Sequence, residues 1–186
     1  MACMRFLAAG AVALQLLGGC FQSRAEDDAG DVETCGMETV LAFGPTGGET
    51  SYDQTYELSP VRTFVATRVT RGVPETRTTC TTQVPECDTE DVLVTDIGDI
   101  ASLLRRPDVE AAFAEGAPPL YGLDDRPVDG TVFAVTRFDG RSFMVGGDCG
   151  SVPSCVPIPP VIALLVRHLQ NLVAQELAQP PCAALR

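Results

Sequence analysis

The hydrophobic pattern in the first half of the chain predicts β-strands. Segment 61–71 places valine or threonine at every second position, and segment 76–84 continues in the same style. A period of two with β-branched residues is typical of a strand whose two faces meet different surroundings. We therefore predict that 61–71 and 76–84 pair as a β-hairpin.

A second hairpin is predicted near residue 140. Asp139-Gly140 separates two strand-forming runs, 131–138 and 141–145. Asp-Gly between such runs is the usual signal of a two-residue type I′ turn. Upstream, the short apolar run 39–43 leads into Gly-Pro-Thr-Gly-Gly at 44–48. This glycine-rich stretch lacks the Gly-Lys-Ser/Thr ending of a phosphate-binding loop, so it predicts a turn.

The longest helix is predicted over 161–179, ended by Pro180-Pro181. One stripe of this segment carries seven apolar side chains, which indicates an amphipathic helix lying across a sheet. The seven are Ile162, Leu165, Val166, Leu169, Leu172, Val173 and Leu177. A shorter helix begins at Asp96, after a short predicted strand at 92–94, and Pro107 suits the first turn of another.

These elements predict an α+β fold. We expect a mainly antiparallel β-sheet, with the long C-terminal helix and one or two short helices packed on it and disulfide bonds stabilising the whole. A chain of 186 residues has room for one such domain, which we place at 35–186.

The first residues have the pattern of a secretory signal peptide. Arg5 precedes an apolar run, 6–17, that is about half the length needed to cross a membrane. The run ends in Leu17-Gly18-Gly19-Cys20, which resembles the lipobox of bacterial lipoproteins. The resemblance implies that residues 1–19 are removed and that Cys20 carries a diacyl lipid. The alternative is an ordinary signal peptide with an incidental cysteine.

The residue after Cys20 is Phe21 rather than aspartate, which by the sorting rule of enteric bacteria resembles a lipoprotein of the outer membrane. Residues 20–34 contain five acidic side chains and little apolar content. This composition is typical of a solvated segment, so we interpret 20–34 as a lipidated acidic tether between the membrane and the domain.

Six cysteines follow the tether, and an even number in an exported chain predicts disulfide bonds. They are Cys35, Cys80, Cys87, Cys149, Cys155 and Cys182. Fifteen pairings are possible. Spacing favours Cys80–Cys87 and Cys149–Cys155 as small loops, which leaves Cys35–Cys182 to close the domain. The spacing does not match a zinc site, and no metal or other cofactor is expected.

Composition narrows the function classes. The formal net charge is −12, all 13 basic residues are arginine, and His168 is the one histidine. An acidic chain without clustered cations is a poor partner for nucleic acid. Nucleophilic catalysis would rest on His168 alone, without a Gly-x-Ser-x-Gly motif. His168 lies at the edge of the apolar stripe and is interpreted as a boundary residue.

A lipid-anchored binding, interaction or structural module of the cell envelope is therefore the leading hypothesis, and we expect no catalytic residues. The tips of the two small loops, Val84-Pro85 and Val152-Pro153, are the candidate contacts for an envelope or extracellular protein. Two alternatives remain open: a hydrolase that uses carboxylates, and a carrier of a small ligand. An apolar concavity between the helix and the sheet would favour the carrier.

Overall fold

The structure is a computed structural model that describes residues 40–47, 52–84, 96–124 and 131–186. These residues form a seven-stranded sheet with the strand order β4-β3-β2-β1-β6-β7-β5. All neighbouring strands are antiparallel except β5 and β7. The strands are β1 (Leu41–Thr46), β2 (Tyr52–Leu58), β3 (Thr63–Thr70), β4 (Thr76–Gln83), β5 (Leu120–Tyr121), β6 (Val132–Arg137) and β7 (Ser142–Val145).

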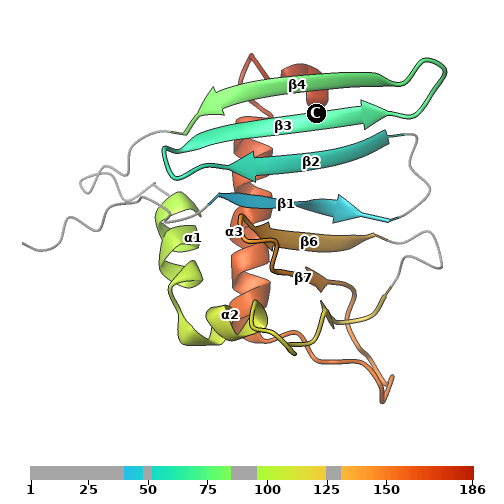
Figure 1. The fold of residues 1–186 in the computed structure, drawn as a ribbon, viewed down its shortest axis with the longest axis vertical. Coiled ribbons are helices and arrows are strands. Elements are labelled where there is room, and N and C mark those ends of the chain that lie inside the picture. The colour runs from blue at the N-terminus through green and yellow to red at the C-terminus, as the bar shows by residue number, and fades with distance from the viewer. Residues whose placement is uncertain (1–39, 48–51, 85–95, 125–130) are drawn as a thin grey trace, which may run out of the picture. The chain divides into compact units, whose positions relative to one another are not determined.

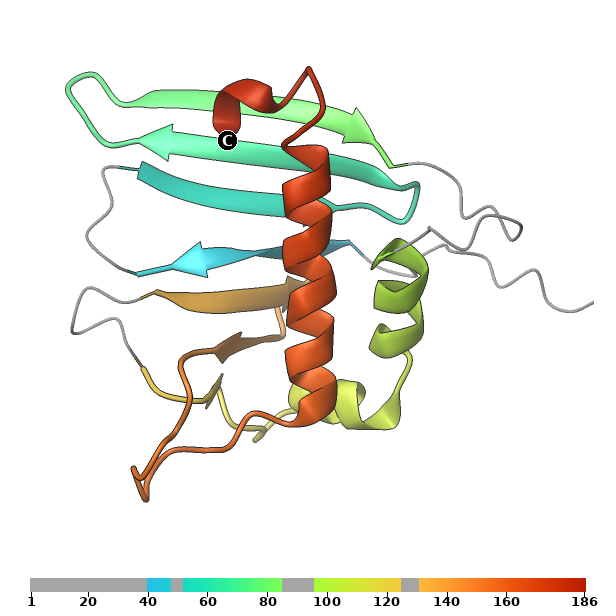
Figure 2. The same cartoon turned by 180° about the vertical axis from the view of Figure 1, so that it is seen from behind.

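Three helices lie on one face of this sheet: α1 (Asp96–Leu104), α2 (Pro107–Ala112) and α3 (Pro160–Glu176). Figure 2 shows α3 running across the strands, with α1 beside it. Within the described ranges, no helix covers the opposite face, which is turned to the viewer in Figure 1. The predicted α+β architecture is thus confirmed, with a long C-terminal helix and two short helices on a mainly antiparallel sheet.

The core lies between the helices and the face of the sheet that they cover. Side chains in register across the central strands are buried there, such as Leu41 opposite Leu58 and Phe43 opposite Tyr56. Six of the seven apolar residues predicted for the stripe of α3 are buried, and Val173 is partly buried. Burial of this stripe is the main contribution of α3 to stability, because apolar burial provides the largest favourable term in folding.

Both predicted hairpins are present, but the type of one turn is corrected. Thr136 pairs with Ser142, and the N–H of Arg137 donates to the carbonyl of Arg141 at 2.9 Å. The loop therefore has three residues, in which Gly140 alone adopts a positive φ, of 82°. A type I′ turn needs positive φ at two central residues, whereas a type I turn followed by one left-handed residue makes a three-residue hairpin.

The turn predicted at 44–48 is wrong for its first half, because β1 continues to Thr46. Pro45 has no N–H to donate, and it lies where β1 pairs only with β6 and no longer with β2. A proline is tolerated in a sheet where no ladder hydrogen bond is lost. The strand predicted at 92–94 lies outside the described residues.

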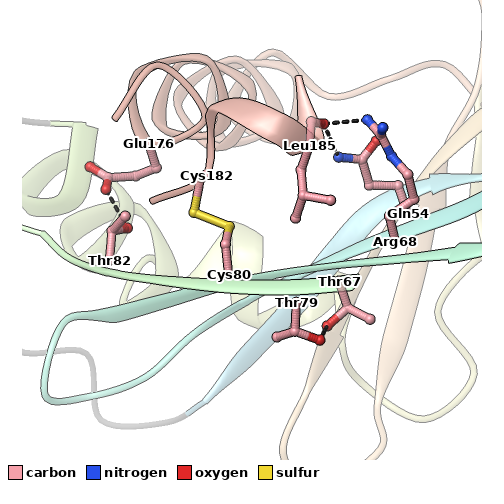
Figure 3. Close-up of a disulfide and its surroundings, with 9 residues drawn as sticks. All are labelled: Gln54, Thr67, Arg68, Thr79, Cys80, Thr82, Glu176, Cys182 and Leu185. Carbon is pink, nitrogen blue, oxygen red and sulfur yellow. Dashed lines mark hydrogen bonds between the residues drawn. A yellow bond between two sulfur atoms is a disulfide. The ribbon is translucent and has the colours of Figure 1, made fainter. Parts of the chain in front are cut away.

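The helices begin where the sequence predicts, at Asp96 and Pro107, but α3 ends at Glu176, three residues before the predicted end. The chain then turns back toward β3 and β4 through a short 3-10 helix, Ala183–Leu185. Leu177, Cys182 and Leu185 of this C-terminal segment are buried, and Figure 3 shows Cys182 and Leu185 on the helix-covered side of the sheet.

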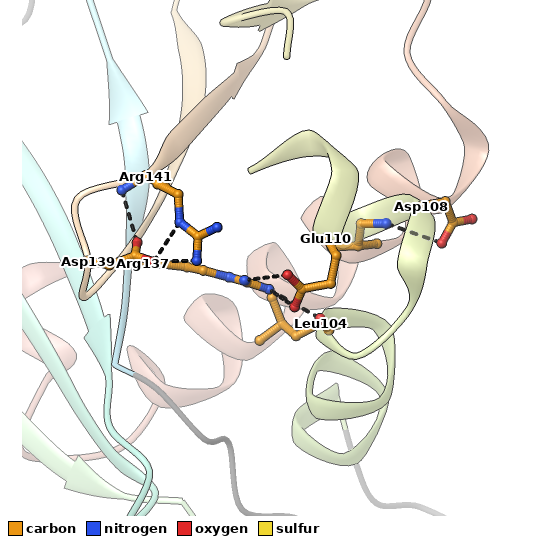
Figure 4. A network of polar contacts seen from close by, with 7 residues as sticks. Leu104, Asp108, Glu110, Arg137, Asp139 and Arg141 are labelled. Atoms are coloured by element: carbon orange, nitrogen blue, oxygen red, sulfur yellow. Dashed lines mark hydrogen bonds and ion pairs between the residues drawn. The ribbon is translucent and has the colours of Figure 1, made fainter. Parts of the chain in front are cut away.

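A buried arginine joins α2 to β6 (Figure 4). Both terminal nitrogens of Arg137 donate to the Glu110 carboxylate, at 2.8 and 2.6 Å, and one also donates to the carbonyl of Leu104 at 3.2 Å. The guanidinium lies 4.1 Å from the ring centre of Phe113. This arrangement satisfies most of the donors of a cation that is only 9% exposed.

Candidate functional site

A cavity of about 430 Å³ lies between α3 and the sheet. Its sheet side is formed mainly by Pro45 of β1, Tyr56 of β2, Phe133 of β6 and Val145 of β7. The remaining lining residues are Thr131, Val132, Gly146, Gly147, Val166, Gln170 and Val173. A volume of roughly 300–1,000 Å³ is typical of small-molecule sites in proteins.

Short side chains explain why this space is not filled. Val166, Gln170 and Val173 line the cavity from α3, and the two valines are smaller than the leucines elsewhere on the stripe. Facing them are two glycines, Gly146 and Gly147, which contribute no side chain. Gly146 is required by a close approach, because a Cβ there would lie 1.7 Å from the carbonyl oxygen of Leu123.

The cavity is electrically neutral over the residues that the structure describes around it. None of its lining side chains carries a formal charge, and the polar ones are the Gln170 amide, the Thr131 hydroxyl and the Tyr56 phenol. Burial raises the pKa of Tyr56 above its usual value, although the positive charge of Arg68 acts in the opposite direction. Tyr56 therefore stays protonated at neutral pH. The site offers apolar surface with a few uncharged hydrogen-bonding groups, and no acid–base pair.

Aromatic rings continue the apolar sheet side of the cavity into the core. Tyr56 lies 5.8 Å from both Phe43 and Phe64, measured between ring centroids, and Phe43 lies 6.2 Å from Phe133. Aromatic pairs at such separations are favourable and fix the orientation of each ring. The sheet side of the cavity is consequently held in shape by its own packing, which is a requirement for a preformed binding site.

The two predicted loop tips differ in their exposure to solvent. Val84 is buried at 6% exposure and its N–H donates to the carbonyl of Arg62 at 2.9 Å, so the prediction of an exposed tip there is wrong. Its neighbour Pro85 lies outside the described residues. Val152 and Pro153 are both exposed, with Val152 at 43%, in the loop that the Cys149–Cys155 bond closes.

The cysteine pairing is partly as predicted. Cys149 pairs with Cys155, which confirms the smaller predicted loop. Cys80 pairs with Cys182 instead of Cys87, so the predicted Cys80–Cys87 and Cys35–Cys182 bonds are wrong. Cys80 faces the helices from β4, and the turn after α3 returns Cys182 to the same face (Figure 3). Cys35 and Cys87 lie outside the described residues, as does the predicted lipidation site Cys20.

Polar contacts reinforce this disulfide. The Thr82 hydroxyl donates to the buried Glu176 carboxylate at 2.5 Å, and the Gln54 amide donates to the carbonyl of Leu185 at 3.0 Å. Arg68 donates to the same carbonyl (Figure 3). Its guanidinium carbon also lies 4.6 Å from the ring centre of Tyr52. These groups attach the C-terminal segment to the sheet, so we assign them a structural role.

His168 lies between α3 and α1, with its Nδ1 3.7 Å from a carboxylate oxygen of Asp99 and 18% of its side chain exposed. This is the boundary position that the sequence predicts. In the described ranges, no group of three or more His, Cys, Asp or Glu side chains is arranged to hold a metal ion. The helices of the described part include none that is long and apolar enough to span a membrane.

Comparison with known proteins finds no matching family model, no matching curated protein and no matching solved structure. The apolar periodicity predicts Val166 and Val173 as core residues of the stripe, but it does not predict the cavity that they line. The available signals were the shortness of these two residues and the Gly146-Gly147 pair at the end of a strand.

Proposed function

We propose that this protein is a lipid-anchored component of a bacterial cell envelope, and that its domain binds an uncharged, largely apolar small molecule without transforming it. The observation that carries the proposal is the neutral, mostly apolar cavity of about 430 Å³ between α3 and the sheet. Such a cavity gains free energy by removing apolar ligand surface from water, while the Gln170 amide and the Tyr56 phenol orient a polar group.

Two features support a location outside the cytoplasm. The sequence 17–20 resembles a lipobox, and the domain contains two disulfide bonds, Cys80–Cys182 and Cys149–Cys155. Disulfide bonds form and persist in oxidising compartments such as the periplasm and the cell surface. Replacing Cys20 by serine in the full chain should abolish metabolic labelling with palmitate and release the protein from the membrane fraction.

Ligand binding is tested with N-phenyl-1-naphthylamine, an uncharged aromatic dye that fluoresces in apolar surroundings. We expect saturable, one-to-one binding to the full chain. Val173→Phe places a larger side chain in the cavity and should weaken binding at least about tenfold, which corresponds to ~1.4 kcal/mol. Leu164→Phe is the matched control, because Leu164 lies on the exposed side of the same helix and should leave binding unchanged.

Equal binding by both variants and the wild type would place the dye elsewhere and contradict the proposed site. A cavity that never takes up the dye in any of the three proteins would contradict an apolar carrier function.

A second candidate function is contact with an envelope protein through the loop 149–155. It is favoured by the disulfide that closes the loop and by the 43% exposure of Val152, since a constrained loop loses little entropy on binding. Cross-linking in the native membrane should lose its products with Val152→Asp and keep them with Val73→Asp, which changes an exposed valine of the β3–β4 turn.

A further inference from the structure

Three parts of the described chain lie at the same ends of the strands, and we call this side of the sheet the membrane edge. They are the turn between β2 and β3, the turn between β6 and β7, and Val40, the first described residue. Leu41 of β1 pairs with Leu58 on one side and with Arg137 on the other. The turns that follow Leu58 and Arg137 therefore lie on either side of Val40, where the described chain enters β1 (Figure 1). The N–H of Phe138 donates to the carbonyl of Val40 at 3.1 Å, which joins one turn directly to this entry point.

Each of these turns exposes an apolar side chain. Val61 in the first is 70% exposed and Phe138 in the second is 82% exposed. Single exposed apolar residues are common on protein surfaces. The unusual feature is their placement, because the two side chains project from turns on both sides of the point at which the N-terminal part of the chain joins the sheet.

The chain length before this edge connects it to the proposed lipid. Cys20 precedes Val40 by twenty positions in the sequence. A chain of this length spans at most about 70 Å when fully extended, so a lipid on Cys20 would hold the edge within that distance of the bilayer. A tether raises the effective concentration of a surface at the membrane, and a weak contact is then sufficient to orient the domain.

We propose that this edge, defined by Val61 and Phe138, rests on the lipid bilayer, with both side chains in the boundary between headgroups and acyl chains. The proposal rests on the lipidation of Cys20 proposed above. Apolar side chains enter this boundary favourably, and arginines beside them are attracted to anionic headgroups. The edge carries Arg62 next to Val61, and the carboxylate beside Phe138, Asp139, is held by Arg141.

This orientation of the domain determines which way the ligand cavity faces relative to the membrane. Pro45 and Phe133, which line the cavity, pair with each other toward the opposite ends of the same strands. With the edge on the bilayer, the cavity faces away from the membrane. The protein would then take up or deliver its ligand on the aqueous side rather than from the lipid phase.

The test uses the absence of tryptophan from the chain. Phe138→Trp introduces a single reporter at the edge. Val73→Trp is the matched control, because Val73 is fully exposed in the β3–β4 turn, at the opposite ends of the strands. Both full-length proteins, with their native acylation, are placed in vesicles of phosphatidylethanolamine and phosphatidylglycerol that contain brominated acyl chains. Fluorescence from position 138 should be quenched about twofold or more, and that from position 73 should not.

The outcomes separate this proposal from the lipidation on which it rests. Mass spectrometry first establishes whether Cys20 is acylated. Acylated protein that is unquenched at position 138 overturns the membrane edge and leaves the anchor intact. If Cys20 is not acylated, the measurement is repeated with a hexahistidine tag at position 20 bound to nickel-chelating lipids. Quenching at position 138 on these lipids would support the contact of the edge with the bilayer, although the proposed lipid on Cys20 is absent. No quenching at position 138 would overturn that contact as well as the lipidation.

Discussion

At the scale of single residues, several polar side chains buried under the helices bind partners from distant parts of the sequence. Arg137 is the clearest case, because its guanidinium connects β6 to Glu110 of α2 and to the end of α1. A buried charge that loses its partner costs more than an exposed one, since water cannot replace the lost contacts.

Replacing Arg137 by methionine should lower the free energy of unfolding by about 1–3 kcal/mol. The change keeps much of the buried volume but removes every donor to Glu110 and Leu104. The matched control is Arg71→Met, which removes an exposed pair with Asp53 and should alter stability by less than about 0.5 kcal/mol. Urea unfolding of both variants measures the difference, and equal effects would show that burial of Arg137 contributes nothing.

The same ion pair predicts a pH dependence. The hydrogen bond from Arg137 lowers the pKa of Glu110 below its usual value, although partial desolvation opposes the shift. A carboxyl with a lower pKa in the folded state contributes stability above its unfolded pKa, about 4.3, and this contribution is lost as the pH falls through the folded pKa. The difference in unfolding free energy between wild type and Glu110→Gln should therefore be largest near neutral pH and shrink below about pH 4. A difference that grows on acidification would contradict the assignment.

Two adjacent threonines of β4 provide a matched comparison of the two faces of the sheet. Thr82 is buried and donates to the carboxylate of Glu176, whereas Thr81 is exposed on the opposite face. Thr82→Val should destabilise the domain by about 1–3 kcal/mol, because a buried carboxylate loses a hydrogen bond. Thr81→Val should change stability by less than about 0.5 kcal/mol, as expected for a surface substitution. Similar losses in thermal or urea unfolding would contradict the contact.

At the scale of elements, the Cys80–Cys182 bond attaches the segment after α3 to an edge strand, with 102 residues of sequence separation. The chain-entropy model gives about 4–5 kcal/mol for a loop of this size and about 2 kcal/mol for the six-residue separation of Cys149–Cys155. Replacing both cysteines of the first pair by alanine should therefore destabilise the protein by about 2–3 kcal/mol more than replacing both of the second. The opposite order in urea unfolding would contradict the model.

The elements themselves could be predicted because local signals determine them. Alternating β-branched residues fixed β3 and β4, and a seven-residue apolar stripe fixed α3. The errors arose where a distant partner decides the outcome. Pro45 continues β1 because β2 has already diverged, and Cys80 pairs with Cys182 because the turn after Glu176 reverses the chain. Neither fact is encoded within a short window of sequence.

The sequence indicated the cavity only weakly, for a related reason. Periodicity identifies Val166 and Val173 as inward-facing, but whether inward-facing side chains meet depends on the shape of the surface opposite. That surface includes Gly146, whose missing side chain is required by the backbone of Leu123.

The predicted exposure of the loop tip at Val84 was wrong because it was inferred from a Cys80–Cys87 disulfide, and Cys80 pairs with Cys182 instead.

At the scale of the whole molecule, the cavity lies between the two layers of the domain, because residues of α3 form one wall and residues of the sheet form the other. A ligand held between layers binds the folded state only, so it must stabilise that state by mass action. The dye N-phenyl-1-naphthylamine at about 100 times its dissociation constant should add ~2.7 kcal/mol to the free energy of unfolding and raise the melting temperature. Val173→Phe should melt at or above the temperature of the wild type without the dye, since the added ring occupies empty space, yet gain little from the dye. A melting temperature that falls on adding the dye would mean that it prefers the unfolded chain, and the cavity would then be a packing defect rather than a site.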